Sequence, residues 1–282
     1  MDLPQEDVLS PRLLMYWSKD LLWRCCSEKL QPLFESNSTY HSVLESLPSN
    51  VFGVVQHRNT NLRKQQARIW AKVVHDYSHR QFTFPEDRFC ALAGVISELQ
   101  FVWGDIYLAG LWRTTFVQHL LWQRTDTAHV PAQRSLTYAP SWSWTAVEYG
   151  VRIIAIERPD AKLIDYNVEP DVPDLPFGQV KQGKIVLRAK SMDDAGMQKA
   201  AKNPRVFTLD QCDDSTKDRY LKDPSHWPRD ARYILLGRKA NDDHAGLILQ
   251  PASRQEFRRV GYIYYSVADT WLKADWISTC II

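Results

Sequence analysis

The spacing of apolar residues changes near residue 138, and this change limits the folds open to the chain. Between residues 62 and 124, apolar residues recur every three or four positions, as on one face of a helix. From Tyr138 onward they alternate, and turns rich in Pro, Gly, Asp and Asn separate the alternating runs. Helices followed by strands predict an α+β fold, with a helical unit packed on a mainly antiparallel β-sheet.

Three helices are predicted in the first part. The first covers residues 62–77, where apolar side chains recur at three and four. The second begins at Thr83, because Thr83 and Glu86 can form a capping box. The third begins near Asp105, a plausible N-cap, and one face of it carries Leu108, Leu111, Trp112, Phe116 and Leu120. Residues 62–124 are therefore interpreted as a three-helix unit.

The N-terminal segment has a different pattern. In residues 9–26, the apolar runs RLLMYW and DLLWRCC flank Ser18, Lys19 and Asp20, which indicates a β-hairpin. Residues 27–61 are polar and irregular, and their composition favours a surface loop.

The β-rich part is predicted over residues 138–282. A polar excursion is expected at 191–230, a short helix at 270–276 and a final edge or buried strand after it. The candidate strands are SWSWTAV, VRIIAIE, KLIDYNV, KIVLRAK, RVFTL, ARYILLG, AGLILQ and RRVGYIYYS. The Trp-rich segment is expected to pack across the seam near residue 135, so residues 1–282 are interpreted as a single domain.

A series of short motifs resembles one region of a known family. The stretch TFPEDRFCALAG (83–94) is followed by YLAGLWR (107–113), LLW (120–122) and YAPSWSW (138–144). This order is similar to the C-terminal region of fungal heterokaryon-incompatibility (HET) proteins. The resemblance extends to LSPRLLMYWSKDLLW (9–23), FGQVKQGKIVLRA (177–189) and FRRVG (257–261). It therefore covers nearly the whole chain.

The N-terminal HET domain itself has no counterpart here. Its usual patterns, Y-ALSY-WG and W-D--CINQ, are absent, and Met1 lies just before the shared region. The resemblance implies a fungal source and a setting of non-self recognition and programmed cell death. A chain without the HET domain is expected not to kill by itself.

Composition and missing motifs exclude several classes of function. The net charge of +2 gives no electrostatic case for binding nucleic acid or an anionic membrane. No apolar run approaches the roughly 20 residues of a membrane span. No cofactor is expected, because the sequence has no Gly-rich phosphate loop, no G-x-S-x-G elbow and no paired CxxC. An odd number of cysteines without a repeating spacing favours a reduced, cytoplasmic location; they are Cys25, Cys26, Cys90, Cys212 and Cys280.

Two charged motifs have both a structural and a functional interpretation. His75 and His79 are four apart in HDYSH, a spacing that can bind a metal, but no third ligand is evident and no metal site is predicted. Asp87 and Arg88 lie in the first turn of the Thr83 helix. Asp87 favours the positive end of the helix dipole, and Arg88 can either bridge to a neighbouring element or anchor an anionic ligand.

Clustered tryptophans form the most suggestive set. Trp112, Trp122, Trp142 and Trp144 either hold a core together or line a site for a flat ligand. In SWSW the two indoles are expected on one side of a strand. In the ligand-binding interpretation, the nearest polar groups are Arg113, Tyr138 and Glu148.

Three hypotheses for function remain open. The first is an interaction or regulatory module of the HET-protein type that binds a protein partner. The second is a cofactor-independent cyclase, isomerase or lyase of fungal secondary metabolism that acts on a hydrophobic or aromatic small molecule. Its site would use Arg88 or Arg113 as an anchor, with the acid or base taken from His75, His119, Asp87 and Glu148. The third is a folded remnant of a longer gene, which would expose a sticky apolar surface.

Overall fold

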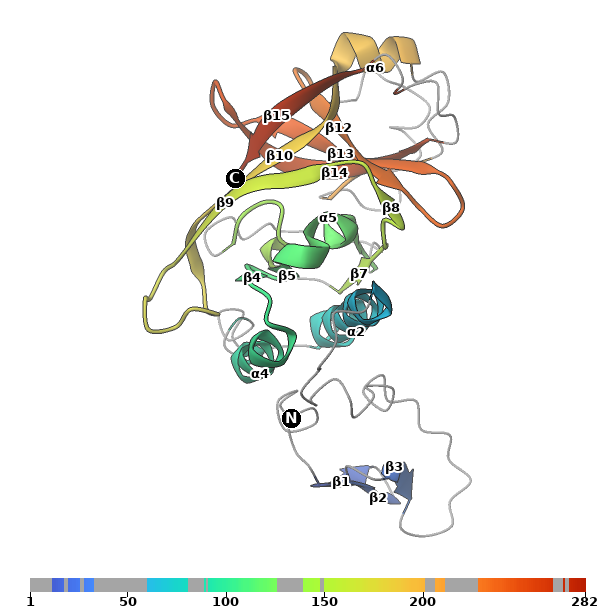
Figure 1. Cartoon of the computed structure of the whole chain (residues 1–282), viewed down its shortest axis with the longest axis vertical. Coiled ribbons are helices and arrows are strands. Elements are labelled where there is room, and N and C mark those ends of the chain that lie inside the picture. The colour runs from blue at the N-terminus through green and yellow to red at the C-terminus, as the bar shows by residue number, and fades with distance from the viewer. Residues whose placement is uncertain are drawn as a thin grey trace.

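The computed structural model describes residues 12–17, 20–25, 28–32, 60–80, 89, 91–125, 139–147, 150–200, 206–210, 228–265, 271 and 274–282. In this part of the chain, helices and short connections precede a large, mainly antiparallel sheet (Figure 1). The predicted α+β class is confirmed.

The N-terminal strands form a sheet of their own. Strands β1 (Arg12–Trp17) and β2 (Asp20–Cys25) pair in the predicted antiparallel hairpin. A third strand, β3 (Glu28–Pro32), pairs with β2 where the polar composition had predicted a surface loop.

The first predicted helix is confirmed as α2 (Thr60–Ser78). Its buried side chains recur at helical spacing and are Ile69, Trp70, Val73, Val74 and Tyr77. At its C-terminal end, the Ser78 hydroxyl accepts a hydrogen bond of 2.8 Å from the main-chain N–H of Val151. This bond ties the end of the helix to the strand that begins at Val151.

The second predicted helix is only partly within the described residues. Thr83 to Arg88 lie outside them, whereas α4 (Ala93–Trp103) buries Val95, Ile96 and Leu99. The helix ends at Gly104, which has a φ of 59° and donates its N–H to the Gln100 carbonyl at 3.0 Å. A left-handed glycine is a common helix stop.

The third predicted helix is wrong. A tight two-stranded hairpin and two short helical turns occupy this segment instead; they are β4 (Tyr107–Leu108), β5 (Leu111–Trp112), η3 (Arg113–Thr115) and α5 (Phe116–His119).

Backbone geometry explains why the segment cannot be one helix. Ala109 and Gly110 have φ values of 39° and 104°, far from the helical region. The Asp105 carboxylate accepts hydrogen bonds from the main-chain N–H groups of Ile106 at 2.8 Å and Thr114 at 3.2 Å. Asp105 therefore closes a loop with Thr114, nine positions later, rather than starting a helix.

The predicted strand at SWSWTAV is also wrong. Ser141 and Trp142 lie in a turn, and the 3₁₀ helix η4 (Trp144–Ala146) follows. The Ser143 hydroxyl accepts the main-chain N–H of Thr145 at 3.0 Å, a local bond that favours a helical start over an extended chain.

The large sheet matches most of the remaining predicted strands. The 151–157 candidate is the exception: β7 (Val151–Ile153) pairs with β6 (Trp122–Arg124) in a separate small sheet. The strands of the large sheet are β8 (Arg158–Pro159), β9 (Lys162–Pro170), β10 (Val180–Asp193), β11 (Val206–Leu209), β12 (Arg232–Arg238), β13 (His244–Pro251), β14 (Glu256–Tyr265) and β15 (Asp275–Ile281).

The order in the large sheet is β8-β12-β13-β14-β15-β10-β9. The far end of β10, at Ser191–Asp193, also pairs with β12, so the strands β12, β13, β14, β15 and β10 close into a ring. The β14–β15 pair is parallel, whereas the other pairs are antiparallel.

Two predictions near the chain's later part need correction. Trp271 is helical, but Asp275 and Trp276 belong to β15, so the predicted helix over 270–276 extends too far. Of the two alternatives for the final strand, the buried one is confirmed, because β15 lies between β14 and β10. The excursion at 191–230 begins later than predicted, because β10 runs to Asp193. Its described remainder contains α6 (Asp194–Ala200) and β11, which returns to pair with β14.

One hydrophobic core joins the helical part to the sheet. It includes Trp70 of α2, Trp112 and Trp122, and residues of β10, β12, β13 and β15 such as Leu187 and Ile281. The opposite face of the sheet packs a smaller core around Tyr233, Ile263 and Trp271. The seam near residue 135 therefore does not separate two cores.

None of the helices within the described ranges is long and apolar enough to cross a membrane.

Candidate functional site

The tryptophans predicted to bind a ligand lie inside the protein. Trp112, Trp142 and Trp144 have at most 1% of their surface exposed. Around Trp112, edge-on aromatic contacts have ring centroids 5.0–5.4 Å apart, and the partners are Trp70, Trp103 and Tyr107. Phe116 packs in the same way on Trp142, at 5.3 Å. Their faces and edges are occupied by other side chains of the core.

Most of these indole N–H groups are also engaged. Trp70 and Trp144 both donate to the Gly110 carbonyl, at 2.9 and 2.7 Å, and Trp122 donates to the Trp142 carbonyl at 2.8 Å. One carbonyl oxygen accepts two such bonds through its two lone pairs. The Nε1 of Trp112 is buried without a partner. The packing supports the core-holding interpretation of the tryptophan set.

Of the polar groups proposed beside the indoles, only Arg113 lies within the described residues. Arg113 follows Trp112 in the chain, but its side chain is exposed, whereas Trp112 is buried. Asp87, Arg88, Tyr138 and Glu148 lie outside the described residues. A role for these residues in catalysis or binding stays a prediction.

His119 is fully enclosed by the core. It is 1% exposed, and its Nδ1 lies 3.3 Å from the Thr115 hydroxyl. Burial lowers the pKa of His119 to about 4, and a hydrogen bond to the Ala67 carbonyl only partly opposes this shift. The imidazole is therefore neutral at pH 7.

His75 and His79 contact each other at the C-terminal end of α2, with ring centroids 4.4 Å apart. His79 donates from Nδ1 to the His75 carbonyl at 2.6 Å, and its Nε2 lies 2.6 Å from the Thr125 hydroxyl. Both ring nitrogens of His79 are thus engaged with protein groups. Within the described ranges, no group of three His, Cys, Asp or Glu side chains could hold a metal ion.

A buried ion pair was not foreseen from the sequence. Arg259 binds the Asp210 carboxylate through two nitrogens, at 3.1 and 3.2 Å, and both side chains are at most 2% exposed. Arg259 also donates to the carbonyls of Leu120 at 2.6 Å and Trp122 at 2.7 Å, and stacks over the Trp122 ring at 3.5 Å. The only sequence signal is the FRRVG motif, which does not distinguish the buried Arg259 from the exposed Arg258.

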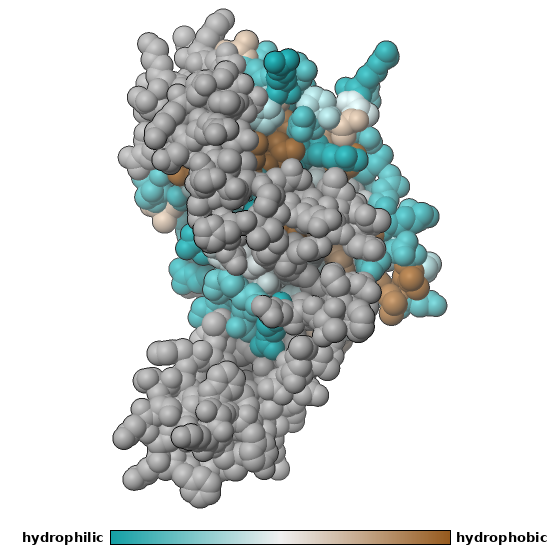
Figure 2. Space-filling view, turned by 180° about the vertical axis from the view of Figure 1, so that it is seen from behind, coloured by the Kyte–Doolittle hydropathy of each residue, from teal (hydrophilic) through white to brown (hydrophobic). Residues whose placement is uncertain are grey.

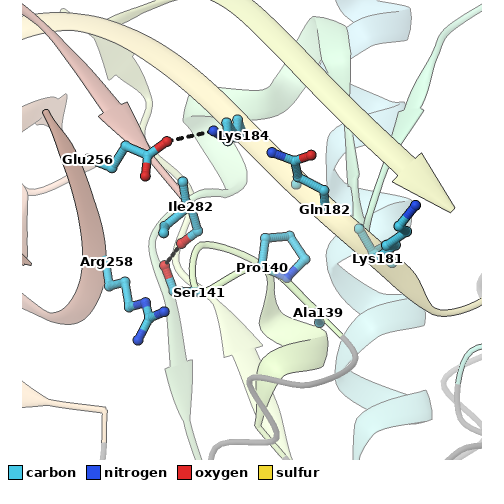
Figure 3. Close-up of a pocket in the computed structure, with 11 residues that line it drawn as sticks. Ala139, Pro140, Ser141, Lys181, Gln182, Lys184, Glu256, Arg258 and Ile282 are labelled. Atoms are coloured by element: carbon cyan, nitrogen blue, oxygen red, sulfur yellow. Dashed lines mark hydrogen bonds and ion pairs between the residues drawn. The ribbon is translucent and has the colours of Figure 1, made fainter. Parts of the chain in front are cut away.

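A surface pocket of about 300 Å³ lies where the loop before Trp142 meets the sheet (Figure 3). Four segments that are separate in the sequence build it, so no local motif could have indicated it. Its charged and polar lining comes from Ser141, Lys181, Gln182, Lys184, Glu256 and Arg258.

Lys184 and Glu256 form an ion pair of 2.6 Å on one wall of this pocket. The hydrogen bond to Glu256 raises the pKa of Lys184, and the same bond lowers the pKa of Glu256. Both groups are therefore charged at neutral pH.

The hairpin formed by β9 and β10 projects from the sheet (Figure 1). Its connection exposes 46% of Val172 and 51% of Leu175, and β9 exposes 55% of Ile164. A small apolar patch shows on the projecting edge of the molecule, surrounded by polar surface (Figure 2). Exposed aliphatic side chains at the tip of a projection are a candidate contact surface.

Comparison with family models, with curated proteins and with solved structures finds no match for this chain.

Proposed function

We propose that this chain is an interaction module, as its resemblance to the C-terminal region of HET proteins implies, and that it binds a protein partner. The observation that carries the proposal is the pair of exposed aliphatic side chains, Val172 and Leu175, on the projecting β9–β10 hairpin.

The hairpin tip is held in a fixed shape. The main-chain N–H of Asp171 donates to the Gln179 carbonyl at 2.8 Å, which closes the loop. Phe177 packs edge-on against Tyr107, with ring centroids 5.9 Å apart, and anchors the loop to the body. Pro173 and Pro176 lie beside the exposed residues, and proline restricts the backbone. A preorganised tip loses less conformational entropy on binding.

The chemistry of the tip indicates what the partner offers. Val172 and Leu175 are aliphatic and convex, so they fit a concave apolar groove. Asp171 and Asp174 are exposed beside them and would lie at the polar rim of such a contact. Burying two aliphatic side chains provides a favourable hydrophobic contribution, of about 1.5–3 kcal/mol for each fully buried group.

The interior supports this proposal over the enzyme hypothesis. The enzyme hypothesis requires aromatic faces open to a substrate, yet Trp142 and Trp144 are fully buried and packed. His119, one of its acid–base candidates, is enclosed in the same core.

The test compares three forms of the full chain expressed in cells of its source organism. They are the wild type, the double variant Val172→Asp/Leu175→Asp, and the control Asp174→Asn, which changes an exposed polar residue of the same loop. We expect one protein to copurify with the wild type and the control, and its recovery to fall roughly tenfold or more with the double variant. Size-exclusion chromatography of each purified form checks that it folds.

Equal recovery of the copurified protein by all three forms would overturn the proposal for this surface. Overexpression of residues 1–282 alone provides a second criterion, because an interaction module is expected to be non-toxic by itself. Toxicity would count against the whole proposal.

A further inference from the structure

Helix α2 carries a row of cations on the face that points away from the core. Trp70 and Val74 are fully buried on its inner face. On the outer face, Lys64, Arg68 and Lys72 are exposed and follow one another at intervals of four residues. Residues four apart lie on one side of a helix, about 6 Å apart along its axis. The three side chains therefore form one straight row of positive charge.

The elements that pack against α2 add further cations. These elements are η3 and β7, and they contribute the exposed side chains of Arg113 and Arg152. Asp76 is the one carboxylate side chain in α2, η3 and β7, and it pairs with Arg80 at 3.1 Å. Positive charge is thus concentrated in this region, although the whole chain has a net charge of only +2.

The row is unfavourable for the helix that carries it. Like charges four residues apart repel, which applies to Lys64 with Arg68 and to Arg68 with Lys72. The N-terminal end of a helix favours acidic side chains, yet the first turn of α2 has none and ends at Arg63. The stability of α2 therefore does not account for these cations, whereas an anionic partner would remove their repulsion.

The surroundings of the row distinguish between classes of anionic partner. Insertion of a helix into a membrane surface requires a free apolar face, but the apolar face of α2 is buried in the core. Proteins that bind single-stranded nucleic acid stack its bases on aromatic side chains, and both Trp70 and Tyr77, the large aromatic residues of α2, are buried. A helix with Asp or Glu at every fourth position presents carboxylates at the same spacing of about 6 Å.

We propose that the outer face of α2 binds an acidic helix of a partner protein, whose Asp or Glu side chains recur every four residues and pair with Lys64 and Arg68. This surface is separate from the hairpin surface proposed above, because Figure 1 shows α2 and the β9–β10 hairpin on opposite sides of the molecule. The double variant Val172→Asp/Leu175→Asp should therefore bind the acidic helix as the wild type does.

The experiment measures binding of labelled synthetic peptides to the full chain by fluorescence anisotropy. The first peptide is an alanine-based helix with Glu at every fourth position. The second has the same composition with its Glu residues distributed around the helix, and the third has Gln in place of Glu. We expect saturable binding of the first, binding of the second weaker by about fivefold, and no binding of the third, since exposed ion pairs each contribute little and must be aligned to add up. Higher salt should weaken the binding.

Two variants of the chain assign the binding to the row. Lys64→Glu/Arg68→Glu should abolish the preference for the first peptide. Lys162→Glu/Arg188→Glu is the matched control, because it reverses two exposed cations that lie opposite each other on β9 and β10, and it should bind like the wild type.

The melting temperature separates a binding role from a structural one. Lys64→Glu/Arg68→Glu should keep or raise it, because acidic side chains suit the N-terminal half of the helix and Lys72 gains an opposite charge four residues before it. A clear fall would show that the cations stabilise the fold, and would count against the proposal.

Other outcomes also overturn the proposal. Equal affinity for the first and second peptides would show that the row does not read the spacing of carboxylates. Equal losses in the reversal variant and the matched control would show that net charge alone decides. Duplex DNA and phosphatidylserine vesicles are measured at the same salt concentration, and tighter binding of either than of the first peptide would assign the row to that class of partner instead.

Discussion

At the scale of single residues, His119 shows how burial alone changes the chemistry of a side chain. Its imidazole lies in the main core, where the charged form loses its hydration, and its pKa falls to about 4. An unfolded chain would return it to about 6.5. The folded state therefore binds fewer protons than the unfolded state between these two pH values.

This difference predicts how stability depends on pH. The contribution of His119 is fully present above pH 6.5 and is lost as the pH falls toward 4, by about 3 kcal/mol in all. His119→Gln cannot take up this proton, so it should flatten the dependence over that interval although it lowers stability at pH 7. Urea unfolding of both forms at several pH values measures the difference. Parallel curves for the two forms would contradict the prediction.

The type of residue predicts whether a side chain is buried better for some residues than for others. Large indoles are rarely left in water, so the burial of Trp112, Trp142 and Trp144 could be expected from their size. The burial of His119 and Arg259 could not, because histidine is intermediate in its tendency to be buried and arginine is mostly exposed. Whether either side chain is buried depends on the residues around it in the folded protein. Those neighbours, such as Asp210, come from distant parts of the sequence.

At the scale of elements, the segment after α4 depends on two glycines with different surroundings. Gly104 has a φ of 59° and open space where a Cβ would lie. Gly110 has a φ of 104°, and a Cβ there would lie 2.8 Å from the Trp144 Nε1 and 2.9 Å from the Ser143 hydroxyl. The second glycine therefore meets both a backbone and a packing requirement.

These two glycines provide a matched pair of variants. Gly104→Ala should cost about 1 kcal/mol, because only the left-handed backbone is strained. Gly110→Ala should cost roughly 3 kcal/mol or more, because it also displaces Trp144 and disturbs the two indole bonds to the Gly110 carbonyl. Urea unfolding followed by tryptophan fluorescence measures both losses. Equal losses would show that packing at Gly110 adds nothing.

Apolar spacing predicted a helix or a strand correctly only where a single regular backbone geometry buries all of the apolar residues in the pattern. The spacing over 62–77 gave the observed helix α2, and the alternation over 184–190 gave a strand within β10. Between 105 and 120, the same apolar residues are buried by a hairpin and short turns, because Ala109 and Gly110 reverse the chain. The apolar periodicity therefore predicts which residues are buried, but it does not always predict the backbone conformation that connects them.

At the scale of the whole molecule, both the helical part and the β-rich part contribute residues to the main core. Trp70 of α2 and Ile281 of β15 belong to the same core, although more than two hundred residues of sequence separate them. The sheet cannot unfold without exposing the apolar faces of α2 and of the segment around Trp142.

The shared core predicts a single unfolding transition for the part of the chain from α2 to β15. Far-UV circular dichroism reports mainly the strands and helices, and fluorescence reports the buried tryptophans, so the two should give coincident urea curves. Two separated transitions would show that residues on either side of the seam near 135 fold independently.

Sheet topology was only partly predictable. The antiparallel character followed from short strands joined by short turns, such as β12–β13 and β13–β14. The parallel pairing of β15 with β14 and the closure of β10 onto β12 were not foreseen. Both depend on long-range pairing, which one sequence does not specify.

The buried arginine also limits the order in which the protein can be completed during synthesis. Arg259 lies on β14, yet its guanidinium supplies the donors for the carbonyls of Leu120 and Trp122 and the charge that balances Asp210. A nascent chain that has reached residue 210 carries a carboxylate and two carbonyls whose partner has not yet been translated. The contacts around Leu120, Trp122 and Asp210 that depend on Arg259 can therefore form only after β14 has been synthesised.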